Sequence, residues 1–255
     1  MYLYLYDDFV KHKKFDGVIK AIETRLTDFG IAGKIIRLAQ FGNAQAIIED
    51  ELKRGYSTVV IVGNDATFGS ILSRAATKGV VFGFLPIGPN NTISKVLGIP
   101  QGIDACDILS RRRKVFLDSG WVNNRYFVSK LQIFPHDIKV SYDEKFSVSS
   151  KSGGKMELVV CNLQPFFWKN TKDQEQVIHP QDGKLEAFIR PVKKKKFFGG
   201  YEYEDPSIFP FEEMEVSSKT PFVVEADGKQ SKEVKIKIKL AKKRIDMIVG
   251  KQRQF

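Results

Sequence analysis

Residues 59–67 have the sequence Val59-Val60-Ile61-Val62-Gly63-Asn64-Asp65-Ala66-Thr67. The first four form a β-branched apolar run, which is typical of a buried parallel strand. Apolar side chains then recur at helical spacing from Phe68 to Ala75. The stretch therefore predicts a strand, a tight turn and a helix. In open α/β sheets such a turn lies at the carboxyl edge, where ligands bind.

The turn at residues 63–65 has two interpretations. The start of the predicted helix would offer unpaired backbone N–H groups to a phosphate. Asp65 would then be a candidate metal ligand or acid–base carboxylate. Alternatively, Asn64 and Asp65 only cap the helix. The turn alone leaves both interpretations open.

A second turn follows the next apolar run, at residues 80–85. Residues 86–100 have the sequence Pro86-Ile87-Gly88-Pro89-Asn90-Asn91-Thr92-Ile93-Ser94-Lys95-Val96-Leu97-Gly98-Ile99-Pro100. In order and spacing, the two blocks resemble the diacylglycerol and sphingosine kinase family of lipid kinases. That family has a Gly-Gly-Asp-Gly-Thr turn, a strand, and then a segment like Pro-Leu-Gly-Thr-Gly-Asn-Asp. The resemblance covers most of the chain, because the later part also looks like the family's β-rich second domain.

The resemblance implies ATP-dependent phosphoryl transfer to a lipid hydroxyl, with Mg²⁺ as the metal. It makes Asp65 a catalytic carboxylate that lies beside the phosphates and binds Mg²⁺. The other residues that it places around the nucleotide are Gly63, Asn64, Thr67, Gly88 and Asn91.

A third block, at residues 225–229, has the sequence Glu225-Ala226-Asp227-Gly228-Lys229. It aligns with the Asp-Gly-Glu turn through which the family's β-rich domain reaches the nucleotide. The resemblance makes Asp227 the second catalytic carboxylate and puts Lys229 where the family has Glu. Lys229 could contact a phosphate, but it removes a possible metal ligand. Without the first two blocks, Asp-Gly favours an ordinary hairpin turn.

Several residues depart from the family's pattern. Asn64 and Ala66 replace glycines, and we expect Ala66 to tolerate a left-handed backbone poorly. Pro89 removes an N–H that could face a phosphate. Asp7 and Asp8 replace a loop that helps to hold the nucleotide, and they would repel phosphate. These departures favour a catalytically impaired homologue that binds a nucleotide, lipid or protein over the alternative of an active kinase.

The alternation of apolar runs and helical patterns predicts an α/β nucleotide-binding domain with a parallel sheet over residues 1–112. From Val115 onward the runs are short or alternating and are separated by turn signals, which predicts a β-sandwich-like substrate domain over residues 113–241. Residues 242–255 are expected to return to the first domain. The resemblance implies a cleft between the domains, in the arrangement that NAD kinases and diacylglycerol kinases share.

The composition narrows the class of protein. The chain has 255 residues, of which 42% are hydrophobic, enough for two modest domains. No apolar run approaches the roughly 20 residues of a membrane span, and no signal peptide is evident. Cys106 and Cys161 lack a metal-type spacing. They favour a cytoplasmic location, with both cysteines packed as small buried residues.

The net charge of +11 favours an anionic partner. The run Lys193-Lys194-Lys195-Lys196 leads into Phe197-Phe198. Basic residues beside aromatic ones suit an anionic membrane surface, where the protein would be peripheral. A solvated hairpin loop is the alternative. No nucleic acid partner is expected, because no recognised nucleic-acid module accompanies these residues.

Overall fold

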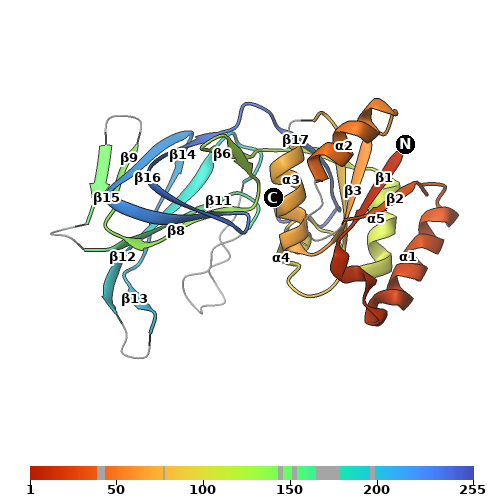
Figure 1. Cartoon of the computed structure of the whole chain (residues 1–255), viewed down its shortest axis with the longest axis horizontal. Helices are drawn as coiled ribbons and strands as arrows, with labels where there is room; N and C mark the ends of the chain where they lie inside the picture. The colour runs from red at the N-terminus through yellow and green to blue at the C-terminus, as the bar shows by residue number, and fades with distance from the viewer. Residues whose placement is uncertain (39–43, 77, 143–145, 151–153, 165–178, 196–198) are drawn as a thin grey trace. The chain divides into compact units, whose positions relative to one another are not determined.

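The computed structural model describes residues 1–38, 44–76, 78–142, 146–150, 154–164, 179–195 and 199–255 (Figure 1). The chain divides into two compact units. The first unit consists of Met1–Leu117 together with Lys243–Phe255, and the second is Asp118–Lys242.

The first unit is built on a sheet whose strand order is β2-β1-β3-β4-β17-β5. The strands are β1 (Tyr2–Tyr6), β2 (Lys34–Arg37), β3 (Thr58–Gly63), β4 (Val81–Pro86), β5 (Lys114–Leu117) and β17 (Ile245–Ile248). Every neighbouring pair is parallel except β17 and β5. The described part of this unit therefore has the predicted parallel sheet, with β5 as an antiparallel edge strand.

Helices cover both faces of this sheet (Figure 1). The α-helices are α1 (Asp16–Asp28), α2 (Ala44–Lys53), α3 (Asp65–Ala75), α4 (Thr92–Val96) and α5 (Ala105–Arg111). The short 3₁₀ helices are η1 (Asp8–Lys11), η2 (Lys13–Phe15) and η3 (Gly102–Asp104). Helix α1 packs with α5, whereas α2 and α4 pack with α3.

The predicted strand, turn and helix around residue 63 are confirmed. Strand β3 is buried along its whole length, as its β-branched sequence predicts for a central parallel strand. Helix α3 turns its apolar residues inward, and the rings of Phe68 and Phe84 pack with centroids 4.8 Å apart. This packing fixes the end of β3 relative to the end of β4.

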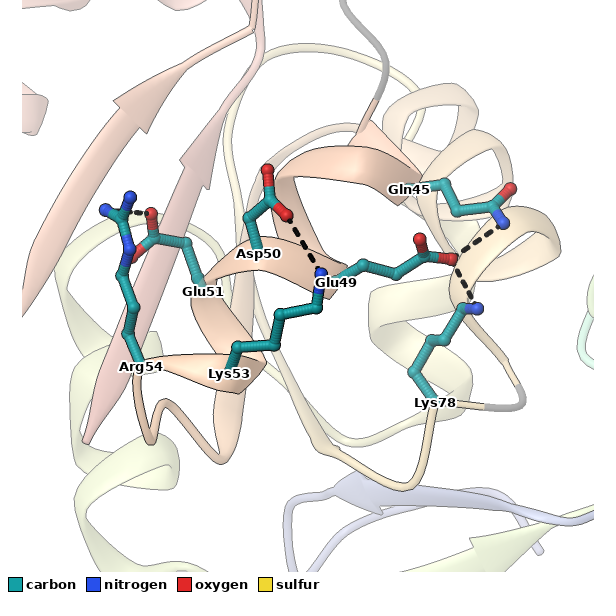
Figure 2. Close-up of polar contacts among 7 residues, drawn as sticks. All are labelled: Gln45, Glu49, Asp50, Glu51, Lys53, Arg54 and Lys78. Carbon is teal, nitrogen blue, oxygen red and sulfur yellow. Dashed lines mark hydrogen bonds and ion pairs between the residues drawn. The ribbon is translucent and has the colours of Figure 1, made fainter.

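Charged side chains attach α2 to its neighbours (Figure 2). Glu51 is only 5% exposed, and its Oε1 lies 2.6 Å from Lys34 Nζ and 3.1 Å from an Arg54 guanidinium nitrogen. Glu49 lies on the exposed side and pairs with Lys78 at 2.5 Å. The buried carboxylate therefore ties α2 to β2, because Lys34 belongs to that strand.

The prediction that the β-rich part starts at residue 113 is wrong for residues 114–117. Strand β5 pairs with β17 of the first sheet, with Leu117 opposite Ile245 and Lys114 opposite Ile248. Along the chain, the first unit therefore ends at Leu117 and the second begins at Asp118. The return of the chain end in β17 supplies β5 with its partner, which local sequence does not reveal.

The second unit is all-antiparallel. Its strands are β6 (Gly120–Val122), β7 (Arg125–Phe127), β8 (Lys130–His136), β9 (Lys139–Tyr142), β10 (Phe146–Ser149), β11 (Met156–Cys161), β12 (Leu185–Lys195), β13 (Tyr201–Tyr203), β14 (Ser207–Phe211), β15 (Glu213–Ala226) and β16 (Lys229–Leu240). In the described residues they form one hydrogen-bonded sheet around a shared apolar cluster that includes Leu131, Val160 and Ile236. The predicted fold class, α/β followed by all-β, is confirmed.

Two expectations from composition concern burial and membranes. Cys106 and Cys161 are both buried and unbridged, as predicted. Burial raises the pKa of the Cys106 thiol to about 11. Within the described residues, no helix combines the length and the apolar character needed to cross a bilayer.

Candidate nucleotide site

The turns after β1, β3 and β4 lie together at the carboxyl edge of the first sheet, because these strands are parallel neighbours. The backbone joins the second and third turns directly. Ile87 donates its N–H to the Gly63 carbonyl at 2.7 Å, and Asp65 donates to the Asn90 carbonyl at 3.1 Å. The structure thus brings together both sequence blocks predicted to surround a nucleotide.

The first N–H groups of α3 all have partners within the protein. Asn64 is the N-cap, and its Oδ1 accepts from the N–H groups of Ala66 at 3.1 Å and Thr67 at 3.2 Å. The N–H of Asp65 is bonded to the Asn90 carbonyl. The expectation that this helix start offers unpaired N–H groups to a phosphate is therefore wrong, because a capping box and a neighbouring turn take them.

Asp65 caps a different helix from the one it begins. Its Oδ2 accepts from Thr92 N at 2.7 Å, and both carboxylate oxygens lie 3.2 Å from Ile93 N. These are the first N–H groups of α4. Burial raises the pKa of Asp65, and the bonds from Ile93 and Thr92 oppose that shift. The capping interpretation is therefore confirmed for Asn64 at α3, whereas Asp65 caps α4 and not the helix that it begins.

A second carboxylate at the edge belongs to Asp7, which follows β1. Thr67 donates its hydroxyl to Asp7 Oδ2 at 2.5 Å, and Asp7 Oδ1 accepts from Phe9 N at 3.1 Å. Gly63 makes this packing possible, because a Cβ atom there would lie 2.6 Å from Thr67 Oγ1. Sequence reasoning treated Asp7 only as a charge that repels phosphate and missed this bond. The available signal was its position directly after an apolar strand, like that of Asn64 after β3.

The residues that replace the family's glycines do not cause the backbone strain that was expected at Ala66. Asn64 has an extended backbone with φ of −112°, and Ala66 lies within α3. Neither residue needs the left-handed region, so the expected strain at Ala66 is wrong. Asn90 stands at a glycine position of the second block and does take a φ of +64°. Asparagine tolerates that conformation better than most residues.

The turn after β4 carries two candidate nucleotide residues. Gly88 has a φ of +82°, and Asn91 donates its side-chain Nδ2 to the Gly88 carbonyl at 2.6 Å. Asn91 is only 4% exposed. Its Oδ1 has no hydrogen-bond partner among the described residues. The turn therefore holds a buried acceptor that a ligand donor could satisfy.

The third sequence block lies in the second unit, on the hairpin that joins β15 and β16. Asp227 and Gly228 have φ of +46° and +78°, and Ala226 pairs with Lys229 across them. Positive φ at both central residues defines a type I′ turn, so the predicted hairpin is confirmed. Lys229 begins β16.

The Asp227 carboxylate accepts a cluster of backbone N–H groups. Their donors are Val128 at 2.7 Å, Ser129 at 2.9 Å and Lys130 at 3.1 Å. Burial raises the pKa of Asp227 to about 6, and these N–H groups oppose the shift. Asp227 thus anchors the hairpin to the start of β8. Sequence reasoning did not find this anchor, since the donors lie nearly 100 residues away in the chain.

A Mg²⁺ centre made by protein side chains alone does not fit the described residues. They contain no group of His, Cys, Asp or Glu side chains that could hold a metal ion. Both oxygens of Asp65 and both of Asp7 already accept hydrogen bonds. Mg²⁺ usually binds through one or two carboxylates together with substrate phosphates and waters.

The basic run of β12 is partly described. Lys193 and Lys194 are exposed and pair with Glu202 of β13 at 3.5 Å and 3.2 Å. Lys195 ends the strand. Lys196, Phe197 and Phe198 lie outside the described residues.

Comparison with known proteins agrees with the fold described above. Residues 2–122 match the diacylglycerol kinase catalytic domain. A diacylglycerol kinase of Staphylococcus haemolyticus is 30% identical over 91 residues, which are 34% of this chain and 28% of that protein. One from Staphylococcus aureus strain JH9 is 28% identical over 93 residues, or 35% and 30% of the two chains. The matched segments thus span less than a third of these relatives.

The crystal structure of a diacylglycerol kinase from Bacillus anthracis superposes on the whole chain. The TM-score is 0.77 at 17% sequence identity, and the match covers 99% of this chain and 97% of the other. At this identity the match shows the fold. The chain therefore has the fold of a two-unit protein, with one α/β unit and one antiparallel β unit. Over residues 2–122 the sequence is similar to the diacylglycerol kinase catalytic domain, and over its length the chain has the fold of a diacylglycerol kinase structure.

Proposed function

We propose that the chain is a lipid kinase homologue with impaired phosphoryl transfer, which binds a nucleotide weakly at the carboxyl edge of the first sheet. The supporting observation is that backbone N–H groups at that edge are already hydrogen-bonded within the protein. The first N–H groups of α3 bond to Asn64 and Asn90, and those of α4 bond to Asp65. Few donors are left for phosphate oxygens, which helix starts usually bind.

In this proposal Gly63, Asn64, Thr67, Gly88 and Asn91 surround the nucleotide, which is ATP. Asp65 is the carboxylate nearest the phosphates. Mg²⁺ would enter with the nucleotide and neutralise phosphate charge. The residues of this chain position the turn and exclude water, while Lys229 could attract a phosphate as a point charge. Phosphoryl transfer needs positioning and a carboxylate that orients the hydroxyl.

An active lipid kinase is the second candidate, and one observation favours it. Burial raises the pKa of Asp227 to about 6, toward the range that suits a general base. Its hydrogen bonds to residues 128–130 would also hold it in a fixed orientation. In this second candidate the substrate is a lipid hydroxyl, reached at an anionic membrane surface.

Calorimetric titration with Mg-ATP tests the proposed site. We expect a dissociation constant on the order of 0.1 mM or weaker, about −5 kcal/mol. Asp65→Asn should weaken the binding further, because the turn after β4 depends on the Asp65 carboxylate. Micromolar binding that Asp65→Asn leaves unchanged would remove the site from this edge.

A further inference from the structure

Two aromatic side chains cover the turn after β4. A Cβ atom on Gly88 would lie 3.0 Å from Phe9 Cε2, 3.3 Å from Phe9 Cζ and 3.7 Å from Phe15 Cζ. The two rings meet edge to face, with centroids 5.6 Å apart. A glycine in such a turn normally leaves room for a ligand to approach the backbone. Here aromatic carbon fills that room.

The segment that carries these rings is held at the carboxyl edge through Asp7. The Asp7 N–H donates to the Val62 carbonyl at 3.0 Å, which continues the pairing of β1 with β3. Its carboxylate accepts from Phe9 N and from the Thr67 hydroxyl. Phe9 lies two residues after Asp7 and donates its N–H to the Asp7 carboxylate, so its place over Gly88 is built into the fold.

Beyond Asp7 the segment consists of the short helices η1 and η2. Its backbone bonds include His12 N to the Phe9 carbonyl at 3.2 Å and Phe15 N to the His12 carbonyl at 2.8 Å. Helices of three or four residues are held by few bonds, and such segments open at low free energy. Lys13 and Lys14 are exposed on it and would attract an approaching phosphate.

We propose that Phe9, backed by Phe15, closes the turn at Gly88, so that a nucleotide reaches this turn only when the η1–η2 segment moves away. The inference rests on the proposed nucleotide site. Opening the segment would uncover a turn whose Asn91 Oδ1 lacks a partner among the described residues. The apparent affinity is then lowered by the small fraction of molecules that are open.

Mg-ATP affinity in matched variants tests the closure. Phe9→Ala should lower the dissociation constant about three- to tenfold, because it raises the open fraction. Phe15→Ala should act in the same direction through the loss of its contact with Phe9. Phe29→Ala is the control. Both Phe15 and Phe29 are half-buried and have a cation over the ring, Lys14 in the first case and Arg25 in the second. Phe29 lies at the other end of α1, about 20 Å from Phe15. Its replacement should leave the affinity unchanged.

Amide hydrogen exchange of the wild type gives a test that needs no substitution. Mg-ATP should speed the exchange of residues 9–15, whereas a ligand that simply covers the segment would slow it. Equal affinity of wild type and Phe9→Ala, with slower exchange in this segment, would overturn the closure and leave the nucleotide site standing. Absence of binding by both proteins would overturn the closure and the site together. Binding by Phe9→Ala alone would support the closure and show that the wild type holds it shut.

Discussion

Asp65 and Thr92 lie 27 residues apart in the sequence, yet Asp65 Oδ2 lies 2.7 Å from the Thr92 nitrogen. This bond connects the turn after β3 to the first residue of α4. We expect Asp65→Ala to lower the free energy of unfolding by about 1–2 kcal/mol, because two helix N–H groups lose their acceptor. Urea denaturation measures the difference.

Asp104→Ala is the matched control for that change. Asp104 is the N-cap of α5, but its side chain makes no capping bond. Its replacement should change the free energy of unfolding by no more than about 0.5 kcal/mol. Equal losses in the two variants would show that the Asp65 bonds contribute nothing beyond the charge at a helix start.

Glu186 of β12 predicts a pH dependence of stability. Burial, reinforced by the charges of Asp182 and Asp118, raises the pKa of Glu186 to about 7. Its Oε2 is buried without a hydrogen-bond partner in the described part of the chain. The protonated carboxyl therefore contributes stability that is complete below the unfolded pKa of about 4.3. That contribution is lost as the pH rises through the folded pKa.

Glu186→Gln keeps the uncharged form at every pH. At about pH 4, below the unfolded pKa, its free energy of unfolding should be close to that of the wild type, and at about pH 8 it should exceed that of the wild type. The exposed Glu204→Gln should show the same difference from wild type at both values. A Glu186→Gln variant that is equally destabilised at both values would contradict the raised pKa.

Membrane contact through the run at residues 193–198 remains a prediction. If it is correct, the protein sediments with anionic vesicles and is released at high salt, since each basic residue near such a surface contributes about 1 kcal/mol. Replacing Lys193, Lys194, Lys195 and Lys196 by Gln should abolish sedimentation. The control removes the same amount of charge elsewhere in the second unit. It replaces Lys235, Lys237 and Lys239 of β16, and Lys242 just after that strand, by Gln. Equal sedimentation of wild type and the first variant would leave that run as a solvated surface.

The sequence was sufficient for the strand, turn and helix around residue 63 and for the parallel sheet of the first unit, because these follow from local periodicity. It was insufficient for the partners of the polar groups. Asn64 caps the helix that directly follows it, which the local sequence pattern indicates. Asp65 instead accepts from the N–H of Thr92, and Asp227 accepts from the N–H of Ser129, and both donors are distant in the sequence. Those contacts depend on how the strands line up. Strand β5 was misassigned for the same reason, because its partner β17 comes from the chain's end.

The central claim is that this kinase-like chain transfers phosphate poorly. The residue that supports this claim most specifically is Lys229, which occupies the position of a carboxylate in the family that the chain resembles. A lysine ammonium has three hydrogen-bond donors and no acceptor, so in that form it cannot take a proton from a lipid hydroxyl. The Ala66→Gly change that family likeness suggests would now weaken α3, because Ala66 lies within that helix. Lys229→Glu alone is therefore the variant in which we expect some gain of turnover.

The most direct measurement is ADP formation from Mg-ATP by the purified wild type over a panel of diacylglycerols and sphingoid bases in mixed vesicles. We predict a rate no higher than that without lipid, and a measurable lipid-dependent rate only in Lys229→Glu. Robust lipid phosphorylation by the wild type, lost in Asp227→Asn while that variant remains folded, would contradict the account and establish an active lipid kinase.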